Sequence, residues 1–97
     1  MEGRRRPDTG SFDREGDYCV VYNDAGLITT LWFSLPHTGQ WGRIIAEAST
    51  EEGPKWKITE DAEGRVTVEP SIHTVWRDAE GDQEYHGFLR GGVWSDA

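Results

Sequence analysis

Alternation of apolar and polar side chains between Lys55 and Trp94 constrains the fold more than any other feature of the sequence. Residues two apart in an extended strand share one face, so this alternation predicts strands with one buried and one solvated side. The tetrapeptide Asp-Ala-Glu-Gly occurs at 61–64 and again at 78–81, and each copy separates two such segments. Asp and Gly favour tight turns. We therefore expect a meander of about five short antiparallel strands in this stretch.

The first half of the chain adds further strand signals. Tyr18–Tyr22 is aromatic and β-branched, and 27–35 (LITTLWFSL) is apolar on both faces, which predicts a central strand. Residues 42–49 alternate as a strand would, although their alanines also permit a short helix. Pro70 has no amide hydrogen, so it indicates an edge, a bulge or a corner between sheets. The predicted fold is all-β or nearly so, a small antiparallel β-sandwich or open barrel with a flexible N-terminal arm.

Charge divides the chain into an arm and a body. Residues 1–16 contain four arginines and four acids, so the formal charge of −8 lies wholly on residues 17–97. We expect 1–16 to be a flexible arm and 17–97 to be one β-rich domain. An acidic body disfavours direct binding to nucleic acid, because phosphates repel it. With Cys19 as its single cysteine and no apolar run long enough for a bilayer, the chain is expected in the cytoplasm and not in a membrane.

Two short segments resemble a known family. Pro70-Ser71-Ile72 and His86-Gly87-Phe88 are similar to segments of a small family of unknown function that is common in phage and actinobacterial genomes. Its members carry a Cys-Pro-Cys cluster that suggests structural zinc, but here Leu35-Pro36-His37 stands in that place. The resemblance implies a small β-rich protein of phage type, working in the host cytoplasm if phage-encoded, without the family's zinc site.

The sequence contains no recognised catalytic motif. Ser71 and Cys19 lack the G-x-S-x-G pattern of a nucleophile elbow, and Ser71 beside Pro70 is explained by turn chemistry. We therefore predict no catalytic residue, no enzymatic activity and no cofactor. No metal site is expected either, since close pairs of ligands are missing. If a zinc or small-ligand site exists, it uses His37, His73 and His86, and the last two are predicted to face each other across paired strands.

Aromatic and acidic residues near the second tetrapeptide turn suggest a docking surface. Five tryptophans are many for one small core, and exposed Trp and Tyr side chains dominate binding energy at interfaces. The predicted partner-binding residues are Trp76, Tyr85, Trp94, Glu80 and Asp82. The resulting hypothesis is a non-enzymatic, phage-type protein that binds a protein partner, a basic one or a second copy of the chain. The alternatives are a degenerate zinc or small-ligand domain and a minor structural protein of a virion.

Overall fold

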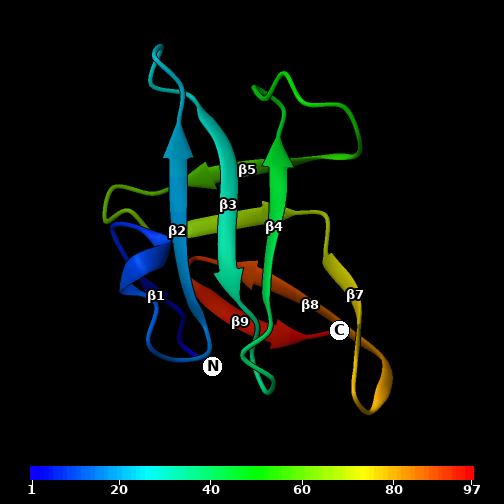
Figure 1. Cartoon of the computed structure of the whole chain (residues 1–97). Helices are drawn as coiled ribbons and strands as arrows, with labels where there is room; N and C mark the ends of the chain where they lie inside the picture. Colours follow the sequence, from blue (N-terminus) through cyan, green and yellow to red (C-terminus); the bar gives the residue numbers. More distant parts are fainter.

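The computed structural model describes residues 1–97 and consists almost entirely of β-strands (Figure 1). Six strands in the order β1-β2-β3-β4-β5-β6 form a sheet that curls into half a barrel, and β7-β8-β9 form a second sheet. The elements are β1 (Arg4–Arg5), the 3-10 turn η1 (Thr9–Ser11), β2 (Asp17–Tyr22), β3 (Ile28–Ser34), β4 (Trp41–Ala46), β5 (Lys55–Glu60), β6 (Val66–Glu69), β7 (Ile72–Asp78), β8 (Gly81–Arg90) and β9 (Val93–Asp96). No helix is long and apolar enough to cross a bilayer.

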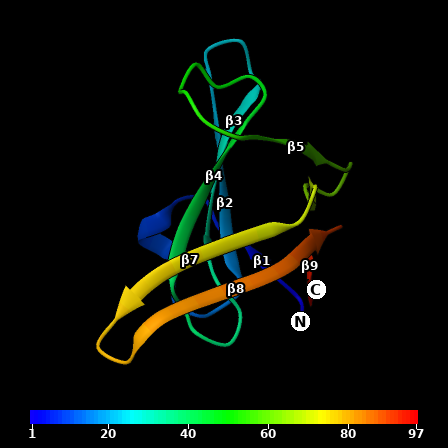
Figure 2. The same cartoon turned by 90° about the vertical axis from the view of Figure 1, so that its right-hand side faces the viewer.

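The predicted fold class is confirmed, and so are the five strands of the second half. β3 lies between β2 and β4, as its apolar sequence predicts, and residues 41–46 form a strand. The five strands are not one continuous meander, because β5 and β6 complete the first sheet. β5 joins that sheet by parallel pairing with β4, and the chain then turns a corner at Pro70 into β7. In Figure 2, β7 and β8 run side by side across the direction of the first sheet.

The core lies between the two sheets and combines four aromatic side chains with seven aliphatic ones. Trp94 of β9 is 2% exposed, and its ring makes edge contacts with Phe33 at 5.8 Å and with Tyr85 at 6.2 Å between ring centroids. Its indole Nε1 donates a hydrogen bond to the backbone oxygen of Gly16 at 3.0 Å, so the buried polar atom is satisfied. The buried cluster comprises Tyr18, Leu31, Phe33, Leu35, Ile44, Val66, Val68, Ile72, Tyr85, Leu89 and Trp94.

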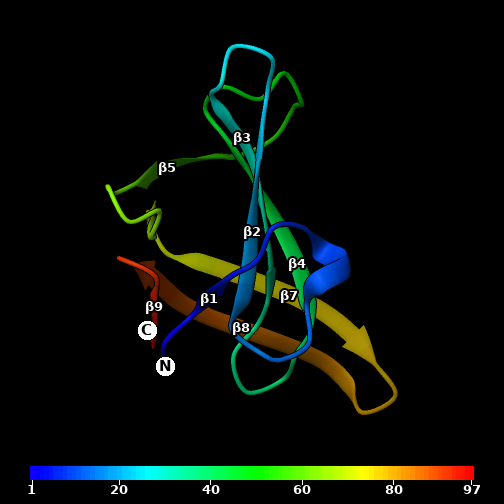
Figure 3. The same cartoon turned by 90° about the vertical axis from the view of Figure 1, so that its left-hand side faces the viewer.

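The N-terminal segment connects the two sheets. β1 pairs in parallel with β2 of the first sheet (Figure 3), while the Met1 ammonium donates to the Trp94 carbonyl of the second sheet at 2.9 Å. The Trp94 amide in turn donates to the Met1 carbonyl at 2.8 Å, and the Gly3 amide donates to the Gly92 carbonyl at 2.8 Å. Residues 1–16, for which the sequence predicts a flexible arm, thus lie along both sheets.

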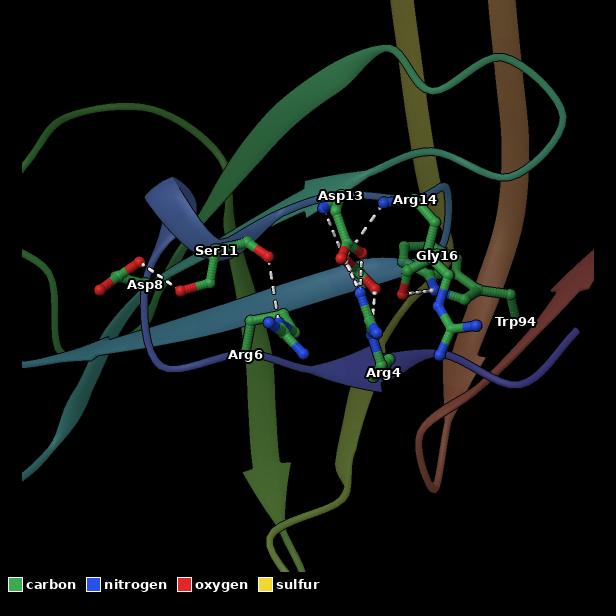
Figure 4. A network of polar contacts seen from close by, with 9 residues as sticks. Arg4, Arg6, Asp8, Ser11, Asp13, Arg14, Gly16 and Trp94 are labelled. Carbon is green, nitrogen blue, oxygen red and sulfur yellow. Dashed lines mark hydrogen bonds and ion pairs between the residues drawn. The ribbon is translucent and has the colours of Figure 1, made fainter.

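A buried carboxylate anchors this segment. Asp17 is 0% exposed and accepts hydrogen bonds from Arg4 Nε at 3.0 Å and Arg4 Nη2 at 2.9 Å. The backbone amides of Asp13 and Arg14 also donate to it, and Arg4 pairs with the Asp13 side chain as well (Figure 4). Burial alone would raise the pKa of the Asp17 carboxyl, but these donors hold that pKa below its ordinary value of 3.8.

Replacing Asp17 should therefore destabilise the chain. Asp17→Asn leaves the Arg4 guanidinium without its buried partner, and we expect the free energy of unfolding to fall by about 3 kcal/mol in urea titrations. Asp13→Asn is the matched control, since the Asp13 side chain meets the same arginine at an exposed position. Its cost should stay below about 1 kcal/mol. Equal costs for the two variants would contradict the assigned role of Asp17.

The lowered pKa of Asp17 also predicts acid sensitivity. Because the unfolded chain binds the proton at higher pH than the folded chain, the stabilisation is present above about pH 4 and is lost as pH falls further. The free energy of unfolding measured from pH 6 down to pH 2 should thus drop more steeply for the natural sequence than for Asp17→Asn. Parallel pH profiles for the two proteins would show that Asp17 titrates alike in the folded and unfolded states.

Candidate functional site

The outer face of the β7–β8 hairpin carries two histidines and a glutamate close together. β7 buries Ile72 and half-buries Thr74 and Trp76, so His73 and Val75 face solvent, as the sequence alternation predicts. His73 lies directly opposite His86 of β8, with ring centroids 5.1 Å apart and ring planes tilted by 43°. The predicted facing of these two histidines is confirmed.

Ser71 completes this cluster from the corner that precedes β7. Its Oγ lies 2.8 Å from Nε2 of His86. The Ser71 carbonyl accepts a hydrogen bond from Trp56 Nε1 at 3.0 Å, so an indole of the first sheet fixes the main chain at the serine. His86 lies on β8, the central strand of the second sheet, and its own carbonyl accepts from the Ala97 amide at 3.0 Å.

Among the five serines, Ser71 alone hydrogen-bonds to an imidazole. The hydroxyls of Ser11 and Ser34 are bonded to the Asp8 carboxylate and the Gly39 carbonyl. That of Ser49 accepts from a backbone amide. A serine hydroxyl next to an imidazole is the arrangement in which the ring removes the hydroxyl proton during nucleophilic attack. The corner of the fold therefore holds a candidate nucleophile together with its base.

A second contact extends the cluster along the hairpin. His73 Nε2 lies 2.8 Å from Oε2 of Glu84, which is two residues before His86 on β8 and hence on the same face. Farther along β8, the Phe88 ring is 6.5 Å from that of His86, and the Arg90 guanidinium covers Phe88 at 4.1 Å. The outer face thus carries a polar pair on one side of His86 and an aromatic ring on the other.

Two of the predicted partner-binding residues cannot form a docking surface. Tyr85 and Trp94 are only 6% and 2% exposed, because the alternation on β8 and β9 turns both rings into the core. Burial and the neighbouring Asp96 raise the pKa of Tyr85 to about 12. Trp76 and Asp82 line an open hollow of about 550 Å³ along the hairpin, together with Val75, Arg77, Gln83 and Glu84. Glu80 is exposed at the hairpin turn.

The three histidines do not converge. His37 lies in the turn after β3, where its Nε2 is 3.1 Å from the Asp96 carboxylate, whereas His73 and His86 face each other on the hairpin. No three side chains of His, Cys, Asp or Glu come close enough together to hold a metal ion. The alternative of a histidine-based zinc site therefore has no geometric support.

Comparison with known proteins gives one finding. Residues 6–97 match the model of a family described as "Bacterial ubiquitination-like system serine protease (BubE)". No curated protein and no solved structure matches the chain.

This match corrects several predictions. The resemblance to a phage and actinobacterial family of unknown function is wrong, since the matching family is a different one. The prediction of a non-enzymatic, phage-type binding protein is also wrong, because the family is named for a protease. Turn chemistry explains why a serine follows Pro70, but it overlooks the imidazole of His86, which lies 15 positions later in the sequence.

The indole of Trp56 should affect both the stability of the fold and the reactivity of Ser71, because it donates a hydrogen bond to the Ser71 carbonyl. Trp56→Phe retains an aromatic ring but removes the donor, and we expect a loss of about 1 kcal/mol in the free energy of unfolding. The hydroxyl of Ser71 should also react more slowly with a fluorophosphonate, since its main chain is no longer held. Trp32→Phe is a control on the first sheet that leaves the Ser71 carbonyl bonded. Unchanged reactivity of Trp56→Phe would contradict this role.

Proposed function

We propose that this chain, which belongs to the BubE family, is a serine protease whose nucleophile is Ser71 and whose general base is His86. The family description supports the reaction type, and the 2.8 Å contact between Ser71 Oγ and His86 Nε2 supports the choice of residues. The family description assigns its members to a bacterial ubiquitination-like system, so the substrate we propose is a protein of such a system.

The proposed reaction begins with proton transfer from Ser71. As Oγ attacks the carbonyl carbon of the scissile bond, the hydroxyl proton passes to Nε2 of His86 and a tetrahedral oxyanion forms. The intermediate collapses when the C–N bond breaks and His86 returns the proton to the departing amine. A water molecule then attacks the acyl-Ser71 ester, gives one proton to His86, and releases the carboxylic acid. Ser71 recovers its proton from His86, so the cycle closes without a cofactor.

The hollow along the hairpin is the proposed place for substrate residues next to the scissile bond. It reaches from Glu84, close to the two histidines, to Asp82 near the turn, and its volume of about 550 Å³ fits several side chains. β7 is also an edge strand, so its outer edge presents backbone groups that an extended peptide can pair with. In this proposal the protein partner predicted from the sequence is the substrate itself.

Labelling with a rhodamine fluorophosphonate tests the nucleophile without knowledge of the substrate. Oγ of the activated serine bonds to phosphorus, fluoride leaves, and the hydroxyl proton goes to the general base. We expect Ser71→Ala to abolish labelling and His86→Gln to slow it by at least about 100-fold, since a general base contributes roughly that much. Peptide mass mapping should find the adduct on Ser71.

The control variant is Ser11→Ala, which removes an exposed hydroxyl that is bonded to the Asp8 carboxylate and not to an imidazole. It should be labelled at the rate of the natural sequence. An adduct on any other serine, or labelling that persists in Ser71→Ala, would rule out Ser71 as the nucleophile.

A further inference from the structure

We infer that His73, held by Glu84, is a positioning residue for His86 and completes a relay of the form Ser71–His86–His73–Glu84. This inference rests on the proposed function of Ser71 and His86 and assigns a role to two further side chains. It arises from the hairpin register, which places His73 opposite His86, and from the strand period, which places Glu84 on the same face.

The contacts of His73 and His86, together with the proposed role of His86 as a base, determine which ring nitrogen of each histidine carries the proton. The Glu84 carboxylate is an acceptor, so Nε2 of His73, at 2.8 Å, carries a proton and Nδ1 of the neutral ring is an acceptor. For His86 to accept the Ser71 proton at Nε2, its own proton must lie on Nδ1. The two nitrogens that remain are therefore a donor on His86 and an acceptor on His73, which are complementary.

The rings are neighbours but are not yet joined by a hydrogen bond. Their centroids are 5.1 Å apart and their planes are tilted by 43°. Catalytic hydrogen bonds are often long or poorly aligned in a free enzyme and tighten once substrate is bound. We propose that the Nδ1–H of His86 turns to Nδ1 of His73 as substrate enters, which fixes the tautomer of His86 and the direction of its Nε2.

No other charged group of the second sheet is placed to orient His86. Asp96, the carboxylate of β9, pairs with Gly87 on the inner side of the sheet, where it contacts Tyr85, and it also binds His37. Arg90 is directed onto the Phe88 ring, on the side of His86 away from Glu84. Among charged groups on β7, β8 and β9, Glu84 alone is linked to the ring that lies against His86.

The Glu84 carboxylate also places a negative charge near His86 during the step in which His86 becomes positively charged. His86 becomes an imidazolium after it takes the Ser71 proton, and a negative charge nearby lowers the free energy of that state. Glu84 is exposed, so water and salt weaken its effect on His86, and the orientation of His86 is the larger contribution. Loss of His73 should therefore reduce the reaction rate more than loss of the Glu84 charge.

The experiment measures the rate constant for labelling by the rhodamine fluorophosphonate between pH 5 and pH 9. His73→Gln should slow labelling at pH 8 by about tenfold or more, because His86 is no longer oriented. Glu84→Gln should slow it less, and Glu84→Asp, which keeps the carboxylate, should restore part of the lost rate. These variants replace exposed side chains, and their circular dichroism melts should match that of the natural sequence.

His37→Gln is the matched control, since His37 also pairs with a carboxylate but lies away from Ser71. It should match the natural sequence in rate and in pH profile. Natural rates in both His73→Gln and Glu84→Gln would overturn the relay, and so would a rate in Glu84→Asp that is no higher than in Glu84→Gln. Labelling that survives in Ser71→Ala would instead overturn the proposed function, so the two failures are distinguishable.

Discussion

Burial of Trp94 between the two sheets is the interaction on which the rest of the structure depends. Its ring meets Phe33 of the first sheet and Tyr85 of the second, its indole bonds to Gly16, and its main chain pairs with Met1. A 97-residue chain has room for only one core, and its four large aromatic rings add buried area to that of seven aliphatic side chains. The relative placement of the two sheets follows from this packing.

The candidate site depends on that placement because it takes parts from both sheets. Trp56 of the first sheet holds the backbone of Ser71, whereas His86 lies on the central strand of the second. Ser71 itself occupies the corner where the chain passes from β6 to β7. In the proposed function, a serine on a corner and a histidine on a central strand would combine a nucleophile with a base whose backbone is held by the sheet, and preorganised catalysis requires such positioning.

Local sequence was enough to predict most of the fold. Alternation and the two Asp-Ala-Glu-Gly turns located β5 to β9, and the apolar run at 27–35 identified the central strand β3. The sequence did not predict which strands belong to which sheet, because no local sequence pattern indicates that β4 and β5 pair in parallel. The contacts of residues 1–16 with both sheets could not be predicted either. Their anchor is a single buried acid, Asp17, and composition does not distinguish a buried acid from an exposed one.

The sequence predicted part of the candidate site, namely the two facing histidines, but not the contact of Ser71 with His86. Pairing of β7 with β8 predicts that His73 faces His86, and Ser71 lies two positions before His73, so a contact with one of the two rings was within reach. A turn next to Pro70 was a sufficient local explanation for Ser71, so its contact with His86 was not predicted. Tyr85 and Trp94, two of the five predicted partner-binding residues, were misplaced for a related reason. Strand alternation requires one face of β8 and β9 to be buried, and both rings lie on that face.

The most direct test of Ser71 and His86 as nucleophile and base is the position of the protons on the two hairpin imidazoles, read by long-range proton–nitrogen NMR of the folded chain at pH 8. We expect His86 to carry its proton on Nδ1, which leaves Nε2 free to accept from Ser71, and His73 to carry its proton on Nε2 next to Glu84. A proton on Nε2 of His86, unchanged when Ser71 is replaced by Ala, would contradict the assignment of His86 as the base.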